Sequence, residues 1–140
     1  MSRADKTTFK QKQLEYFSDF DVNFARNPVT GNLAKVVNED AIKQSLKMLI
    51  LTSLTERPYD QLLGSKVKTT LFDLNTNFDL EPTLEVTIRS ACQNEPRAKL
   101  EKLKLGYDSD RNAVGISIWF SCLNMPNQIF TLNLVVKNIR

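Results

Sequence analysis

Apolar residues recur at helical spacing in two stretches of the chain. The first stretch has apolar positions at i, i+4, i+7 and i+8, namely Ile42, Leu46, Leu49 and Ile50. This spacing places them on one face of a helix, for which Asn38 is the expected N-cap. We predict a helix from Asn38 to about Ser53. The loop around Pro58 would close it, because proline disfavours helical geometry in the residue before it.

A second stretch repeats the same spacing with Leu84, Ile88, Ala91 and Cys92. Pro82 suits the first turn of a helix, because the N–H groups there make no hydrogen bond within the helix and proline lacks one. Pro96 cannot continue a helix. We therefore predict a second helix from about Glu81 to about Asn94, and a short helix over residues 67–72 between the two.

The last third of the chain alternates apolar and polar positions. The apolar members form three groups: Leu103, Leu105 and Tyr107; Val114, Ile116, Ile118 and Phe120; and Phe130, Leu132, Leu134 and Val136. Such alternation is typical of strands with one face on a core, and polar turns at residues 108–112 and 124–128 separate the groups. The pattern predicts an α+β fold in which two main helices are followed by, and packed on, a three-stranded antiparallel meander.

The N-terminal part is less regular. Residues 1–16 are mostly polar and basic, and are interpreted as an extended, flexible arm, either solvated or ordered by a partner. Aromatic residues in the stretch 16–24 favour a short strand or extended segment, and residues 27–32 form a turn around Pro28 and Gly31. The expected organisation is an arm over 1–16 and a single domain over 17–140.

Composition narrows the possible chemistry. The chain has 140 residues, a formal net charge of +3, 4 Gly and no His. The lack of histidine excludes Ser-His and Cys-His dyads and imidazole zinc sites, and the glycines form no phosphate-binding loop. Cys92 and Cys122 lack metal-ligand spacing and are expected to be reduced, buried thiols. We expect no cofactor and no metal.

Targeting signals and nucleic-acid signals are weak. No apolar run reaches the roughly 18 residues of a membrane span, and residues 1–12 lack the apolar segment of a signal peptide. We therefore expect that the newly made protein is cytoplasmic and that it has no membrane partner. Residues 97–104 are basic and could face an acidic protein or a nucleic acid. However, Lys102 and Lys104 alternate with leucines as on the solvated side of an edge strand, and no aromatic residues interleave with them.

Paired carboxylates are the main enzymatic option. The candidates outside helix starts are Glu56, Asp60, Asp73, Asp79 and Glu95. Two of them could supply an acid and a nucleophile for glycoside hydrolysis. The sequence offers no means of bringing two of them to a set distance.

Two arginine–proline junctions stand at predicted element ends. Glu95-Pro96-Arg97 lies between the second helix and the first strand of the meander, and Arg57-Pro58 lies after the first helix. Arginine is a planar, permanently charged donor suited to paired hydrogen bonds with carboxylates or carbonyls. Each junction is either a partner-binding site or a helix-stop proline beside a surface arginine.

The order of these features resembles a known family. The order is an apolar helix, Glu56-Arg57-Pro58-Tyr59-Asp60, Gly64, Thr70-Leu71-Phe72, a helix from Glu81-Pro82, Glu95-Pro96-Arg97, and strands. Over roughly residues 36–138 this is similar to the baseplate wedge proteins of contractile phage tails. These form the gene product twenty-five, W or "lysozyme-like" family, which includes a subunit of type VI secretion baseplates. Gln61-Leu62-Leu63 departs from the proline and phenylalanine that the family usually places before the glycine.

This resemblance implies a structural subunit rather than an enzyme. Family members lie in a virion tail baseplate, assembled in the bacterial host cytoplasm, in about six copies around the tail tube. Their partners are other wedge subunits, the tail sheath subunit and the tail tube, with no nucleic acid. The resemblance implies that Glu95-Pro96-Arg97 seats the protein on the helical core bundle of the wedge. The family's old label suggests the alternative, a peptidoglycan hydrolase acting through paired carboxylates.

A meander also offers free edges for a partner strand. The edge formed by the first strand of the meander carries Lys99, Lys102 and Lys104, whose charges discourage pairing with another strand. The final strand, with Phe130, Leu132 and Leu134, has little charge before Lys137, and we expect it to be the more adhesive edge. The resemblance implies that sheath strands add to this sheet.

Overall fold

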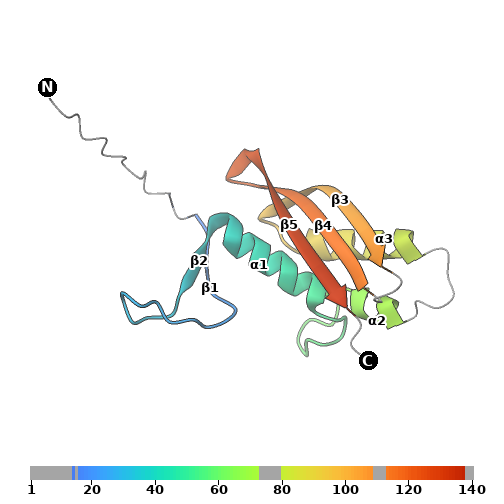
Figure 1. Ribbon diagram of the computed structural model, residues 1–140, viewed down its shortest axis with the longest axis horizontal. Helices are drawn as coiled ribbons and strands as arrows, with labels where there is room; N and C mark the ends of the chain where they lie inside the picture. Colours follow the sequence, from blue (N-terminus) through green and yellow to red (C-terminus); the bar gives the residue numbers. More distant parts are fainter. Residues whose placement is uncertain (1–13, 15, 73–79, 109–112, 138–140) are drawn as a thin grey trace, which may run out of the picture.

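The computed structural model describes residue 14 and residues 16–72, 80–108 and 113–137. Its elements, in chain order, are β1 (Ser18–Phe20), β2 (Lys35–Val37), α1 (Asn38–Leu51), α2 (Val67–Phe72), α3 (Leu80–Gln93), β3 (Ala98–Asp108), β4 (Ala113–Cys122) and β5 (Met125–Lys137). The class is α+β, as predicted. Figure 1 shows β1 and β2 apart from the main sheet, beside the N-terminal end of α1.

The main sheet is antiparallel in the order β3-β4-β5, so β4 is central and β3 and β5 are the edges. Helix α3 packs along β3, and α1 contacts both α3 and β5 (Figure 1). The core between these layers is fully apolar and is made of Ile42, Leu46, Ile50, Val67, Leu84, Ile88, Cys92, Val114, Ile116, Ile118, Phe120, Cys122, Leu132, Leu134 and Val136. Both helical stripes and the second and third strand patterns therefore face this core as predicted. Leu103 and Leu105 of the first pattern also pack against it, whereas Tyr107 is exposed.

The ends of α1 differ from the prediction. Val37 precedes the helix and no side chain caps it, so Asn38 is not the N-cap. The helix ends at Leu51 because Thr52 turns to an extended conformation, with its N–H donated to the Met48 carbonyl. Pro58 therefore lies well beyond the helix end and does not terminate it.

Asn38 instead fastens the start of the described chain to α1. Its side chain is buried, accepts hydrogen bonds from the N–H groups of Tyr16 (2.9 Å) and Phe17 (3.4 Å), and donates one to the Leu14 carbonyl (2.8 Å). Its backbone has φ 50°, in the left-handed region that asparagine tolerates better than most residues. A local capping signal at Asn38 thus serves a contact between segments distant in the chain.

Replacing Asn38 with alanine should lower the free energy of unfolding by about 2 kcal/mol, because three part-buried backbone groups lose a partner and alanine tolerates a positive φ poorly. Faster hydrogen exchange at the amides of Tyr16 and Phe17 would report the loss directly. Asn38→Asp keeps the acceptor oxygen and should fall between the wild type and alanine. Unchanged exchange at both amides would contradict the assignment.

The sequence predicted the first strand and the turn of the N-terminal hairpin, but not its second strand. The predicted extended segment forms β1, which pairs with β2, and the predicted turn at residues 27–32 is confirmed by hydrogen bonds between Asn27 and both Gly31 and Asn32. Gln44 of α1 holds this hairpin, accepting from the Val22 N–H (3.2 Å) and donating to the Phe20 carbonyl (2.6 Å).

The last turn is shorter than predicted. Leu123 and Asn124 alone separate β4 from β5, which begins at Met125. Cys122 pairs with Met125 whereas Ser121 pairs with Ile129, so the remaining predicted turn residues bulge out of the strand. The first residues of the arm, 1–13, and the turn at 109–112 lie outside the described residues.

Both cysteines are buried free thiols, as expected. Burial raises the pKa of Cys92 to about 11, against a smaller opposing effect of the Arg89 charge. A thiol with so high a pKa is a poor nucleophile. Among the described helices, none is both long and apolar enough to cross a bilayer.

Candidate functional site

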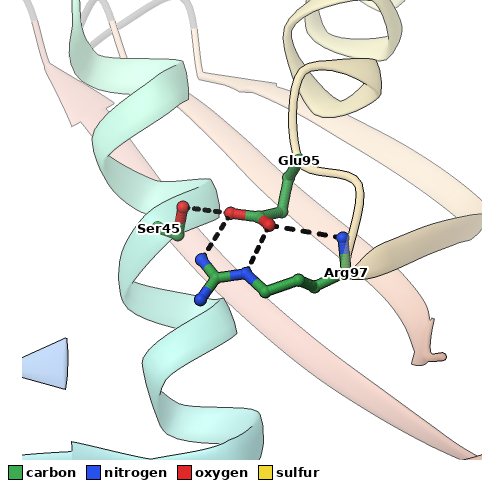
Figure 2. A network of polar contacts seen from close by, with 3 residues as sticks. All are labelled: Ser45, Glu95 and Arg97. Atoms are coloured by element: carbon green, nitrogen blue, oxygen red, sulfur yellow. Dashed lines mark hydrogen bonds and ion pairs between the residues drawn. The ribbon is translucent and has the colours of Figure 1, made fainter. Parts of the chain in front are cut away.

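Glu95 and Arg97 form a closed ion pair at the junction of α3 and β3 (Figure 2). The Arg97 Nε lies 2.6 Å from Glu95 Oε1 and its Nη2 lies 2.8 Å from Oε2, so both carboxylate oxygens are engaged. The Arg97 backbone N–H also points to Oε1, at 3.4 Å. Pro96 allows this because it turns the chain between the two residues without needing an amide donor of its own.

Two further elements meet this pair. Ser45, in the middle of α1, donates its hydroxyl to Glu95 Oε2. The guanidinium carbon of Arg97 lies 5.5 Å from the centre of the Phe17 ring, within the range of a cation–π contact. We call Phe17, Ser45, Glu95 and Arg97 the junction cluster. It joins α1, the end of α3, the start of β3 and the N-terminal hairpin.

The burial of the pair is unequal. The Glu95 side chain is 5% exposed and the Arg97 side chain 30% exposed. Burial raises the pKa of Glu95, but hydrogen bonds from Arg97 and Ser45 and the charge of Arg97 outweigh it, so the net pKa lies below its usual value. The carboxylate is held ionised, and Arg97 keeps part of its guanidinium at the surface.

This pairing makes stability depend on pH. Because the pKa of Glu95 is lower in the folded chain, the unfolded chain takes up the proton first as pH falls. The contribution is complete above the ordinary pKa of 4.5 and is lost as pH drops through the folded-state value. Urea midpoints should therefore fall below about pH 4.5, and less steeply in Glu95→Gln. Parallel curves for the two proteins would contradict this role of Glu95.

A hollow of about 380 Å³ opens beside the cluster. It is lined by Arg89, Cys92, Gln93, Glu95, Pro96, Ala98, Lys99 and Leu100. Pro96 is exposed, so the apex of the motif and the free part of Arg97 are the portions that a partner could touch. The hollow is mixed in character, with apolar walls and basic side chains at its rim.

The second arginine–proline junction has no comparable structure. Arg57 and Pro58 are exposed in the loop between α1 and α2. In the portions of the chain that the structure describes, the Arg57 side chain has no hydrogen bond or ion pair. The same loop exposes Tyr59 and Leu62 almost completely.

The side chains of the predicted edge residues Phe130, Leu132 and Leu134 face the core of the protein. Leu132 and Leu134 are buried in the core and Phe130 packs against it, 5.9 Å from Phe120 between ring centres. Their side chains are thus occupied within the protein. What β5 offers a partner is its outer backbone, since among the described strands it pairs with β4 alone.

The described carboxylate candidates have different surroundings. The Glu56 side chain accepts a hydrogen bond from the Ser53 N–H (2.8 Å), Asp60 is exposed, and Glu95 is paired with Arg97. Asp73 and Asp79 lie outside the described residues. Within residues 14, 16–72, 80–108 and 113–137, no group of three or more His, Cys, Asp or Glu side chains could hold a metal ion.

Sequence reasoning identified Glu95 and Arg97 but missed Phe17 and Ser45. Ser45 interrupts the α1 sequence at a polar position beside Gln44, and both polar residues turn out to bind other segments. Two adjacent uncharged polar residues, in a helix whose other polar residues after Asn38 are all charged, were the available signal. No local pattern indicated Phe17, which lies 80 positions before Arg97 in the chain.

The fold is shared with chains of solved tail and baseplate structures. No family model and no curated protein sequence matches this chain. A protein of Geobacter sulfurreducens, described as a candidate tail lysozyme, has a TM-score of 0.62 at 19% identity, covering 76% of this chain and 98% of its own. A chain in the anti-feeding prophage baseplate has a TM-score of 0.57 at 19% identity, covering 88% and 87%.

A chain in the post-contraction baseplate of pyocin R2 is a weaker match, with a TM-score of 0.48 at 16% identity, covering 81% of this chain and 97% of its own. The first two likenesses agree, at the level of the fold, with the family resemblance indicated by the motif order.

Proposed function

We propose that this protein is a structural subunit of a contractile tail baseplate, which links wedge components around the tube and starts sheath assembly. The observation that carries the proposal is a fold shared, over most of both chains, with a chain in the anti-feeding prophage baseplate. The Glu95-Pro96-Arg97 order, found at the helix-to-strand junction that the family resemblance implies, supports it.

The β5 edge is the proposed site of strand addition by the first sheath ring. Its exposed residues are mostly apolar or uncharged, including Ile129, Thr131, Asn133 and Val135. The opposite edge is poorer, because β3 has a bulge between Leu100 and Lys102 and exposed lysines, two devices that discourage edge pairing.

The strand-addition proposal predicts selective protection of one edge. The protein would be co-expressed with a sheath protein and wedge proteins, and its hydrogen exchange compared with that of the free chain. We expect slower exchange over residues 125–137, because a new strand bonds the free N–H groups of β5, and little change over residues 98–108. Equal protection of both edges, or protection of β3 alone, would contradict the assignment to β5.

The junction cluster is the proposed seat on the wedge. Because Glu95 and Arg97 already pair within the chain, a partner would contact the exposed Pro96 and the outer part of Arg97. A suitable test is Pro96→Arg, which obstructs this surface and leaves the ion pair in place, with Ser90→Arg on α3 as the matched control. Wedge assembly should fail only in the Pro96 variant; assembly by both would exclude the seat.

The hydrolase alternative rests on the description of the Geobacter sulfurreducens protein. A glycosidase acid needs a raised pKa, whereas the pKa of Glu95 is lowered. A zymogram with purified protein distinguishes the two functions. We expect no cleared band, and a band abolished by substituting one Glu or Asp would replace the structural proposal.

A further inference from the structure

The face of the main sheet turned away from α1 and α3 is a second surface, which shares the outward side chains of β5 with the proposed strand-addition edge. Strand pairing orders its residues in rows across β3, β4 and β5: Lys102, Trp119 and Thr131; Lys104, Ser117 and Asn133; and Gly106, Gly115 and Val135. We call these nine residues the open face. Both lysines are exposed and Val135 is 67% exposed, so the described helices leave this face uncovered.

The open face has a marked charge pattern. Lys102 and Lys104 occupy successive outward positions on β3, and the bulge at Glu101 keeps both on this face. The Lys102 Nζ lies 5.6 Å from the centre of the Trp119 ring. Over the described part of the chain, neither lysine has an anionic partner. Unpaired positive charge thus borders an indole ring.

The face is also hollowed beside this stripe. Gly106 and Gly115 lie opposite each other, and the missing side chains leave a hollow of about 370 Å³ that Tyr107, Val135 and Lys137 help to line. A Cβ built on Gly106 would meet nothing closer than the Gly115 carbonyl oxygen, at 4.0 Å. There is therefore room for an incoming apolar side chain.

We propose that the open face binds an acidic amphipathic helix of a neighbouring protein. Successive residues on one side of a strand are about 6.8 Å apart, and residues one turn apart on a helix are about 6 Å apart. Two glutamates at i and i+4 therefore match Lys102 and Lys104. Apolar residues beside them would contact Trp119 and fill the hollow. Helices are the usual cover for an exposed sheet face.

This surface differs from the β5 edge, because it uses side chains rather than strand backbone. Trp119 is the only tryptophan in the chain, so its fluorescence reports events at the centre of the open face. The probe is a synthetic amphipathic helix of Glu, Leu and Ala, with glutamates at i and i+4 and no tryptophan. Its control has lysine in place of every glutamate.

We expect the acidic peptide to shift Trp119 emission to shorter wavelength and to reduce acrylamide quenching, with an affinity that falls as salt rises. The double variant Lys102→Glu/Lys104→Glu should weaken binding by at least about tenfold. Lys66→Glu/Lys68→Glu makes the same charge change on exposed lysines around α2 and should leave binding within about twofold. Circular dichroism confirms that each variant is folded.

Results of three kinds, concerning the signal, the controls and the ligand class, would overturn the proposal. One is an unchanged Trp119 signal with the acidic peptide. Another is an equal response to the lysine peptide, or an equal loss in both double variants. The third is a stronger response to an oligonucleotide, single-stranded or duplex, than to the acidic peptide, which would assign the face to nucleic acid.

Discussion

Replacing Arg97 with alanine should lower the free energy of unfolding by about 3 kcal/mol. The change leaves the Glu95 carboxylate, whose side chain is 5% exposed, without its charged partner inside the protein. The Ser45 hydroxyl and the backbone N–H of residue 97 would still donate to it. Urea unfolding at neutral pH measures the difference, and the pKa of Glu95 should rise at the same time.

The exposed pair Arg89–Glu85 on α3 is the matched control. Its side chains are 46% and 43% exposed and lie one helical turn apart, so Arg89→Ala should cost only about 0.3–0.5 kcal/mol. Adding Glu95→Gln to Arg97→Ala should recover part of the loss, because no buried charge then remains. If Arg97→Ala costs no more than Arg89→Ala, the cluster does not stabilise the fold.

Replacing Gly64 with alanine should cost about 4 kcal/mol, combining strain at a disfavoured φ with overpacking. Gly64 has φ +132°, and a Cβ there would lie 2.6 Å from the Thr52 carbonyl oxygen. The loop is fixed at this point because the Ser65 N–H bonds that same oxygen at 2.8 Å and the Ser65 hydroxyl bonds the Ile50 carbonyl. Thermal unfolding should show a large loss of stability.

Gly106→Ala provides the comparison for Gly64→Ala. Gly106 lies in a strand, where alanine fits both the backbone and the space, so its effect should stay within about 0.5 kcal/mol. Similar losses in the two variants would mean that removing any glycine destabilises this chain. In that case the close approach of Gly64 to the end of α1 would not be the cause.

The double role of Arg97 affects how assembly experiments are interpreted. A variant that loses the ion pair would fail to assemble either because its partner surface has changed or because it has unfolded. Pro96→Arg separates these possibilities, because Pro96 is exposed and takes no part in the bonds of the cluster. The stability measurements on Arg97→Ala therefore come before any assembly assay.

The sequence by itself determined the helices, the three strands of the main sheet and their packing side, whereas β2 was not predicted. Apolar stripes at positions such as Leu46 and Ile88, and alternation through Ile116 and Ile118, are local patterns with a direct geometric meaning. Pairing the strands as a meander also follows from short connections between neighbours. The motif order indicated the fold that the comparisons then matched.

Only the tertiary structure decided what the polar residues do. Asn38 looks like a cap but bonds residues 14, 16 and 17, and Ser45 meets Glu95 at a separation of 50 positions. Hydrogen bonds between distant segments leave no periodic trace in a sequence, because each depends on the path of the chain between them. The uncovered sheet face likewise appears only when α1 and α3 have both packed on the other side.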